Sequence, residues 1–274
     1  MTPEPTEDDE PSVAVRPRRK GIYALPNAIT LGALFSAFYA IVMAMNGRFE
    51  IACVAIFAAA ILDSLDGRIA RMTNTQSAFG EQMDSLSDMV AFGAAPALII
   101  YMWALKDMGK PGWIPAFVYI AGAALRLARF NVNIGVVDKR FFQGLPSPAA
   151  AAIVMGLIYW AIDARWYEGV GNMPWLRGLA FGVTLFAGLS MVTNAPFYSF
   201  KVFDRRRSVP FVVLVIIMLG IGLIAMEPPT VLFCIFCVYG LSGYAVYAWR
   251  KAKGKPVSVI STSTDEPDER GLHQ

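Results

Sequence analysis

Long apolar runs separated by short polar segments fill this chain between residues 21 and 250. A helix needs about 20 mainly apolar residues to cross a bilayer, and about eight runs approach that length. The expected spans are Pro26–Asn46, Phe49–Thr73, Met83–Leu105, Trp113–Phe130, Pro148–Trp166, Leu176–Phe197, Pro210–Met226 and Pro229–Trp249. The pattern predicts an all-α polytopic membrane protein with about eight transmembrane helices.

The distribution of basic residues predicts which side of the membrane each loop faces. Loops on the cytoplasmic side of a membrane carry an excess of Lys and Arg. If the N-terminus is cytoplasmic, nineteen of the 24 Lys and Arg residues fall on the cytoplasmic side. The opposite side then holds only Arg48, Lys106, Lys110, Arg165 and Arg177. We therefore expect both termini in the cytoplasm, and the protein in the inner membrane of the cell.

The two ends differ in composition from the apolar middle. Residues 1–20 are acidic and then basic, residues 251–274 are polar, and neither segment has the apolar residues of a core. We expect both ends to be disordered around one membrane domain, residues 21–250. Hydrophobic residues make up 56% of the 274 residues and charged residues 16%, which excludes an ordinary soluble protein. The one histidine, His273, lies in the C-terminal segment, so histidine catalysis within the membrane domain is excluded.

Four carboxylates interrupt the apolar pattern between Asp63 and Asp88. On a helix with about 3.6 residues per turn, Asp63 and Asp66 share one face, and Asp84 and Asp88 share a face of the next helix. Two such helices, if they face each other, direct all four carboxylates at one place. Like charges repel, so the cluster needs a cation to remain ionised. Oxygen ligands without His or Cys favour a hard ion, Mg²⁺ or Mn²⁺, over zinc.

Three neighbouring residues indicate what binds beside the metal. Gly67 and Gly80 remove side-chain volume next to the carboxylates, so a ligand can approach the backbone. Arg71 supplies a planar cation suited to phosphate. Mg²⁺ is often shared between carboxylates and substrate phosphates, so the combination predicts a pyrophosphate substrate. Two solvated helix ends would explain the pattern without any function, but carboxylates at a membrane are costly and usually functional.

The stretch from Asp63 to Asp88 resembles the signature of the CDP-alcohol phosphatidyltransferases. That signature reads DxxDGxxAR, eight further residues, and GxxxDxxxD. Its fixed positions are matched here by Asp63, Asp66, Gly67, Ala70, Arg71, Gly80, Asp84 and Asp88. The resemblance implies a membrane enzyme that uses CDP-diacylglycerol as its donor substrate.

The resemblance also implies a role for each matched carboxylate. One metal ion is held by Asp63, Asp66 and Asp84. A second ion lies among Asp63, Asp84 and Asp88, and Asp88 is the general base. We therefore expect two ions of Mg²⁺ or Mn²⁺.

Further residues match positions that bind the donor in this family. Gly67, Arg71 and Ser77 match contacts to the cytidine diphosphate, and Gly80 lies beside them. Asn27 and Thr30, near the start of the first span, resemble a pair that contributes to the nucleotide pocket. Asn27 is also placed to cap that helix, which would be a purely structural role.

Two arginines lie at the cytoplasmic end of the fourth span. Arg126 and Arg129 lie three residues apart on one helical face, which favours an anion site for a lipid phosphate or an acceptor carboxylate. Two arginines extended toward the membrane surface would give the same pattern. The sequences RLARFN and GLPSPAAA resemble the phosphatidylserine synthase branch of the family. Asn131 and Ser147 belong to that resemblance and are expected at the acceptor or lipid phosphate site.

The predicted reaction transfers the phosphatidyl group of CDP-diacylglycerol to the hydroxyl of L-serine, giving phosphatidylserine and CMP in phospholipid biosynthesis. Glycerol 3-phosphate, inositol or its phosphate, and choline are alternative acceptors, because the carboxylates bind only the shared donor. A divalent-cation transporter is an alternative from another class. Transporter sites usually lie near the bilayer midplane in repeated halves, whereas no second Asp-rich copy occurs here.

The expected partners follow from this reading. They are CDP-diacylglycerol, L-serine and membrane lipids, with no nucleic acid, and the active site faces the cytoplasm. Pairs of glycines in the last two spans, at 220 and 222 and at 240 and 243, permit close helix packing. They serve either a homodimer or packing within one chain.

Overall fold

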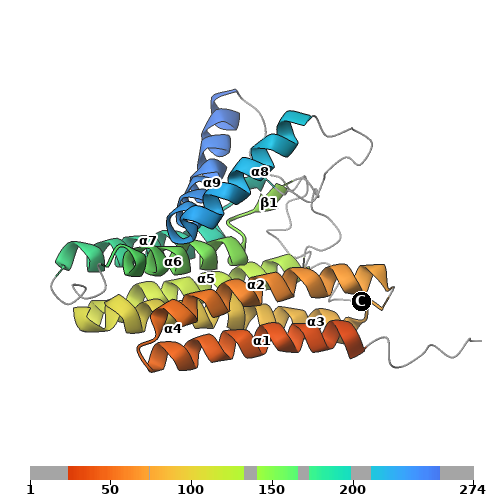
Figure 1. The fold of residues 1–274 in the computed structure, drawn as a ribbon, viewed down its shortest axis with the longest axis horizontal. Helices are drawn as coiled ribbons and strands as arrows, with labels where there is room; N and C mark the ends of the chain where they lie inside the picture. Colours follow the sequence, from red (N-terminus) through yellow and green to blue (C-terminus); the bar gives the residue numbers. More distant parts are fainter. Residues whose placement is uncertain (1–23, 74, 133–140, 166–172, 199–210, 254–274) are drawn as a thin grey trace, which may run out of the picture.

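A computed structural model describes residues 24–73, 75–132, 141–165, 173–198 and 211–253 of the protein (Figure 1). The segments expected to be disordered, 1–20 and 251–274, lie outside the described residues, apart from the end of the last helix at residues 251–253. The described part is almost entirely helical, which confirms the predicted all-α class.

The elements follow one another in a simple order. They are α1 (Ala24–Met45), α2 (Phe49–Met72), α3 (Ala78–Asp88), a π-helical turn (Met89–Ala94), α4 (Ala95–Ile100), a second π-helical turn (Tyr101–Leu105), two 3₁₀ turns (Lys106–Met108 and Lys110–Gly112), α5 (Trp113–Val132), β1 (Phe141–Gln143), α6 (Ser147–Asp163), α7 (Pro174–Val192), β2 (Pro196–Tyr198), α8 (Phe211–Met226) and α9 (Pro228–Ala252).

Five of the described helices are long and apolar enough to cross a membrane: Leu25–Met45, Ala78–Met108, Lys110–Val132, Pro174–Val192 and Pro228–Ala252. The helix α6 is also apolar but has only 17 residues, and α8 has 16. The helix α2 is long enough, but its C-terminal half is charged. Each expected span therefore overlaps a helix, while the count of eight membrane crossings stays a prediction.

The predicted boundaries were wrong by several residues at two places. The third span was expected to begin at Met83, but the helix begins at Ala78, where Ser77 caps it by accepting a hydrogen bond from the Gly80 amide at 3.1 Å. The sixth span was expected to reach Phe197, but α7 ends at Val192. The chain there turns into β2, which pairs antiparallel with β1. The hydropathy pattern did not predict these two short strands.

Small residues let the helices of the core approach closely. The buried face of α1 includes four alanines, Ala33, Ala37, Ala40 and Ala44, and α1 packs on α2, whose buried face also carries several alanines. Gly122 on α5 meets Gly188 on α7 directly, because a Cβ atom at Gly122 would overlap the backbone carbonyl of Gly188. A Cβ atom at Gly188 would in turn lie only 2.7 Å from the Cα of Tyr119. Van der Waals contact between small residues is the usual means of helix association in a membrane.

The last two helices differ in direction from the others. Figure 1 shows α1 to α7 running side by side, with α8 and α9 rising steeply from them. The helix α9 packs on α6. A Cβ atom at Gly240 would lie 2.9 Å from Ile153, and one at Gly243 would overlap the ring of Phe197. These two glycines therefore serve packing within the chain.

Candidate active site

The four acidic residues predicted to act together do meet. Asp63 and Asp66 lie on α2, and Asp84 and Asp88 lie on α3. Carboxylate oxygens of Asp63, Asp66 and Asp84 lie within 4.8 Å of one another. Asp88 lies close enough to Asp63 and Asp84 to interact with both electrostatically. We call these four residues the carboxylate site.

Two observations show that a cation fits the carboxylate site. Oxygens of three carboxylates converge at a spacing that one or two small ions can bridge. The Oδ1 atom of Asp88 is buried and has no hydrogen-bond partner among the described residues. A buried charged oxygen without a partner is costly unless a cation or a hydrogen-bond donor binds there. The donor set, which is all oxygen, suits a hard divalent ion.

The first helix orients one of these carboxylates. The hydroxyl of Thr30 on α1 donates to Oδ2 of Asp66 at 2.6 Å. Both side chains are buried, with exposed fractions of 4% and 5%. A hydrogen bond protected from water fixes the direction of the carboxylate and helps to satisfy its charge.

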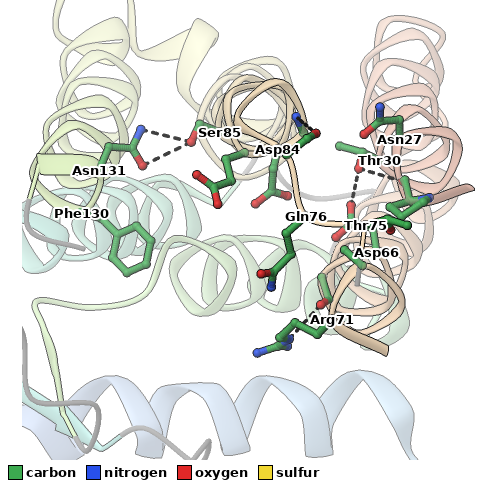
Figure 2. A pocket seen from close by; sticks show the side chains of 16 residues that line it. Asn27, Thr30, Asp66, Arg71, Thr75, Gln76, Asp84, Ser85, Phe130 and Asn131 are labelled. Carbon is green, nitrogen blue, oxygen red and sulfur yellow. Dashed lines mark hydrogen bonds between the residues drawn. The ribbon is translucent and has the colours of Figure 1, made fainter. Parts of the chain in front are cut away.

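A cavity of about 470 Å³ opens beside the carboxylate site. Figure 2 shows that Asp84 points into it, with Thr30 and Asp66 on one side and Ser85 and Asn131 on the other. Its lining comprises Pro26, Asn27, Thr30, Asp66, Gly67, Ala70, Arg71, Thr75, Gln76, Ser77, Gly80, Glu81, Asp84, Ser85, Phe130 and Asn131. All six residues predicted to bind CDP-diacylglycerol are in this lining. The cavity is large enough for a small polar group such as a nucleotide.

Local structure explains several of these positions. Asn27 lies inside α1, which begins at Ala24, so the structural alternative, in which it caps that helix, does not hold. Gly80 permits a close approach of α3 to α1, because a Cβ atom there would lie 3.3 Å from Oδ1 of Asn27. Gly67 faces open space. The Nε of Arg71 donates to the Gly67 carbonyl at 2.8 Å, which places the guanidinium at the rim of the cavity.

Sequence reasoning missed part of the lining. Thr75 and Gln76 lie in the eight-residue spacer of the signature, where no residue type is fixed. Ser85 follows Asp84 directly, and its hydroxyl exchanges hydrogen bonds with the amide of Asn131 at 3.1 and 3.3 Å. This contact joins α3 to the end of α5 across the cavity (Figure 2). The spacer length was the one signal in the sequence that pointed to these residues.

The predicted acceptor residues do not gather in one place. Arg126 on α5 donates from Nη1 to the hydroxyl of Ser147, at the start of α6, at 2.8 Å. Its Nε is buried without a hydrogen-bond partner in the described part of the chain. Arg126 also interacts electrostatically with Asp88. We call Arg126 and Ser147 the arginine site.

The other two predicted acceptor residues lie outside the arginine site. Asn131 lines the cavity at the carboxylate site instead. Arg129 makes no hydrogen bond or ion pair with the residues that the structure describes.

A comparison with known families assigns the chain. Residues 23–196 match the CDP-alcohol phosphatidyltransferase family. The protein belongs to this family. The match covers α1 to α7 and therefore both the carboxylate site and the arginine site, and it ends before α8 and α9.

Individual relatives within this family carry names that state their acceptor. A CDP-diacylglycerol–serine O-phosphatidyltransferase from Helicobacter pylori is 34% identical over 221 residues, which is 80% of this chain and 90% of that protein. One from Mycobacterium tuberculosis is 37% identical over 177 residues, 62% of this chain and 60% of that protein. An archaetidylserine synthase from Methanothermobacter thermautotrophicus is 37% identical over 133 residues, 48% of this chain and 56% of that protein. These three names share one acceptor, serine.

Proposed function

We propose that this protein transfers the phosphatidyl group of CDP-diacylglycerol to the hydroxyl of L-serine, giving phosphatidylserine and CMP. The observation that carries the proposal is the meeting of the four signature carboxylates at a polar cavity in a chain of this family. Serine as the acceptor is supported by the names of relatives that match most of the chain.

The donor would bind with its cytidine diphosphate in the cavity beside the carboxylate site. Asn27, Thr30, Gly67, Arg71, Ser77 and Gly80 would contact it, since all six line the cavity. Arg71 at the rim supplies a cation for the phosphates. The two acyl chains would extend along apolar helix surfaces into the bilayer.

The metal would be Mg²⁺ or Mn²⁺, with two ions in the carboxylate site. Asp63, Asp66 and Asp84 would hold one ion, and Asp63, Asp84 and Asp88 the other, which accords with the contacts among these residues. Bound ions of this type neutralise charge on the pyrophosphate and on the departing CMP.

Asp88 would be the general base. A serine hydroxyl is a weak nucleophile, and a carboxylate within hydrogen-bond reach accepts its proton as the oxygen attacks phosphorus. The bond from phosphorus to the CMP oxygen breaks as the new phosphodiester forms. The free Oδ1 of Asp88 is an acceptor of the required kind.

Arg126 would bind the serine carboxylate. Its side chain lies between Asp88 and Ser147, so an amino acid held there would present its hydroxyl toward the base. Ser147 orients the guanidinium. Arg129 and Asn131 would contribute at the edge of this region, to the acceptor or to a lipid phosphate.

The protein would cross the inner membrane eight times, with both termini and the active site in the cytoplasm. Two facts support this arrangement, the helices that overlap each expected span and the excess of Lys and Arg on one side. The cytoplasm also supplies the serine. A homodimer would use other surfaces than Gly240 and Gly243, which pack inside the chain.

The test uses purified protein in detergent with CDP-diacylglycerol and Mg²⁺ or Mn²⁺. CMP release is followed with serine, glycerol 3-phosphate, inositol or choline added singly, and the lipid product is identified. The proposal requires release that depends on serine, with phosphatidylserine formed. Stimulation by another acceptor alone would refute the serine assignment and leave the donor chemistry intact. Absence of release with every metal and acceptor would favour cation transport by the same carboxylates.

A further inference from the structure

The last helix contacts the segment that builds the arginine site, although it lies beyond the residues matched by the family. The helix α9 packs on α6 and on β2. The hydroxyl of Tyr239 on α9 donates to the backbone carbonyl of Tyr198, the last residue of β2, at 3.2 Å. This hydrogen bond ties the end of the strand to the helix.

Aromatic packing strengthens this contact. The ring of Phe197 on β2 is buried between Tyr239 and Tyr244, with centroid distances of 5.8 and 6.2 Å. Gly243 leaves room for that ring. The hydroxyls of Tyr244 and Ser190 lie 2.7 Å apart, which joins α9 to α7 as well. The helix α9 therefore holds β2 by two aromatic contacts and a hydrogen bond.

The strand β2 in turn positions the start of α6. It pairs with β1, which leads directly into Gly144 and Ser147. Gly144 has φ of +78°, and its amide donates to the carbonyl of Ala195 at 3.0 Å. A side chain at Gly144 would overlap the backbone of α7. The position of Ser147, and through it that of Arg126, therefore depends on where β2 lies.

Tyr239 is also near the cation itself. It lies within electrostatic range of Arg126, whose Nε is buried without a described partner. A buried guanidinium donor without a partner is costly unless a ligand or another acceptor satisfies it, and an anion does so best. Tyr239 thus lies near the cation that would hold the acceptor carboxylate.

We infer that α9 is part of the acceptor site and that Tyr239 is a positioning residue, which sets how tightly the acceptor carboxylate binds. Tyr239 acts through the Tyr198 carbonyl, β2, β1 and Ser147. This inference rests on the proposed function, because it concerns the acceptor of that reaction. It predicts an effect on acceptor binding and none on the donor, whose cavity is lined by α1, α2, α3 and the end of α5.

The test compares Tyr239→Phe with Tyr247→Phe in the full chain. The first substitution removes one hydroxyl and keeps the ring that packs on Phe197. The second removes a hydroxyl from a half-exposed tyrosine two turns further along α9. Loss of one positioning hydrogen bond should raise the KM for serine about 3- to 10-fold. The KM for CDP-diacylglycerol should stay within about 2-fold, and Tyr247→Phe should leave both constants unchanged.

A second substitution tests the same chain of contacts at another point. Gly243→Ala places a methyl group against Phe197 and should displace β2, so the KM for serine should again rise more than the KM for the donor. An unchanged serine KM in Tyr239→Phe, or an equal rise in both KM values, would overturn the inference. If the wild-type protein uses another acceptor, the proposed function is refuted. The inference about Tyr239 is then tested separately, by comparing the KM of the two tyrosine variants for that acceptor.

Discussion

The carboxylate site and the arginine site lie next to each other, yet the chain builds them in different ways. The carboxylate site comes from two consecutive helices, α2 and α3, and its residues follow a fixed spacing between Asp63 and Asp88. The arginine site brings together Arg126 on α5 and Ser147 on α6, and β1, β2 and α9 hold the latter in place.

The two sites also differ in their surroundings. The carboxylate site borders a polar cavity of about 470 Å³, large enough for part of a substrate. Arg126 is mostly enclosed by protein, and one of its donors has no described partner. The carboxylates themselves come from one short segment of the chain, so their meeting depends mainly on local spacing. The arginine site depends instead on contacts between segments that are far apart in the sequence.

The largest effect is expected from metal removal, which acts on the carboxylate site alone. Treatment with EDTA should abolish CMP release, because without a bound cation the four like-charged carboxylates repel a pyrophosphate. Added Mg²⁺ or Mn²⁺ should restore activity, and Ca²⁺ of equal concentration serves as the comparison. Full activity after exhaustive chelation, checked by metal analysis of the protein, would refute metal dependence.

Asp88→Asn should have the next largest effect, since Asp88 lies between the two sites. Loss of the general base should lower kcat about 10²- to 10⁴-fold, while binding of CDP-diacylglycerol, measured by equilibrium titration, is largely kept. Asp107→Asn is the control, because Asp107 pairs with Arg177 at 3.8 Å on the surface. Parallel loss of donor binding and turnover in Asp88→Asn would instead make Asp88 a metal ligand without a role as base.

Substitution in the arginine site should affect only the acceptor. Arg126→Gln removes the charge that faces Asp88 and Ser147, and the KM for serine should rise about 10- to 100-fold, since a hydrogen bond to a charged group contributes about 1.5–3 kcal/mol. The KM for CDP-diacylglycerol should stay near the wild-type value. Arg129→Gln, three residues along the same helix, should raise the serine KM much less. A larger rise in the serine KM for Arg129→Gln than for Arg126→Gln would indicate that the acceptor binds near Arg129 and not at the arginine site.

Thr30→Val should give the smallest of these effects, and it should act on the metal requirement and not on the acceptor. It removes the hydroxyl that orients Asp66 and keeps the size of the side chain. The Mg²⁺ concentration at half-maximal activity should rise about 10-fold, as is common when a residue that orients a metal ligand is lost. Thr30→Ser retains the hydroxyl and should stay near wild type. A shift in the serine KM, with no shift in the metal requirement, would contradict the claim that Thr30 acts on the carboxylate site and not on the arginine site.

Much of the carboxylate site could be predicted from the sequence. Residues three or four apart on a helix share a face whatever surrounds them, so the spacing of Asp63, Asp66, Asp84 and Asp88 already predicted one cluster. The lining contributed by Thr75 and Gln76 was missed because their side-chain directions depend on the turn between α2 and α3. Ser85, inside α3, was missed because its partner Asn131 lies on α5, far along the chain. The helical class was also predictable, since apolar runs of this length form helices in a membrane.

The arginine site could be predicted only in part. The sequence identified Arg126 and Ser147 but grouped them with Arg129 and Asn131, which lie close to Arg126 along the chain. Asn131 lies five residues beyond Arg126 and therefore on another face of the helix, where it reaches Ser85 at the cavity. No local pattern indicated that β1 and β2 pair, because three-residue strands carry too little periodicity to detect.

The sequence by itself predicted the membrane class, a carboxylate cluster suited to a hard cation, and the donor expected of the family, because each depends on short-range spacing or on composition. Only the tertiary structure decided which arginine meets Ser147, that Asn131 belongs to the cavity, and that α9 holds β2 through Tyr239. Those arrangements result from packing between helices far apart in the chain, where the close approach of small residues such as Gly243 sets the positions of their neighbours.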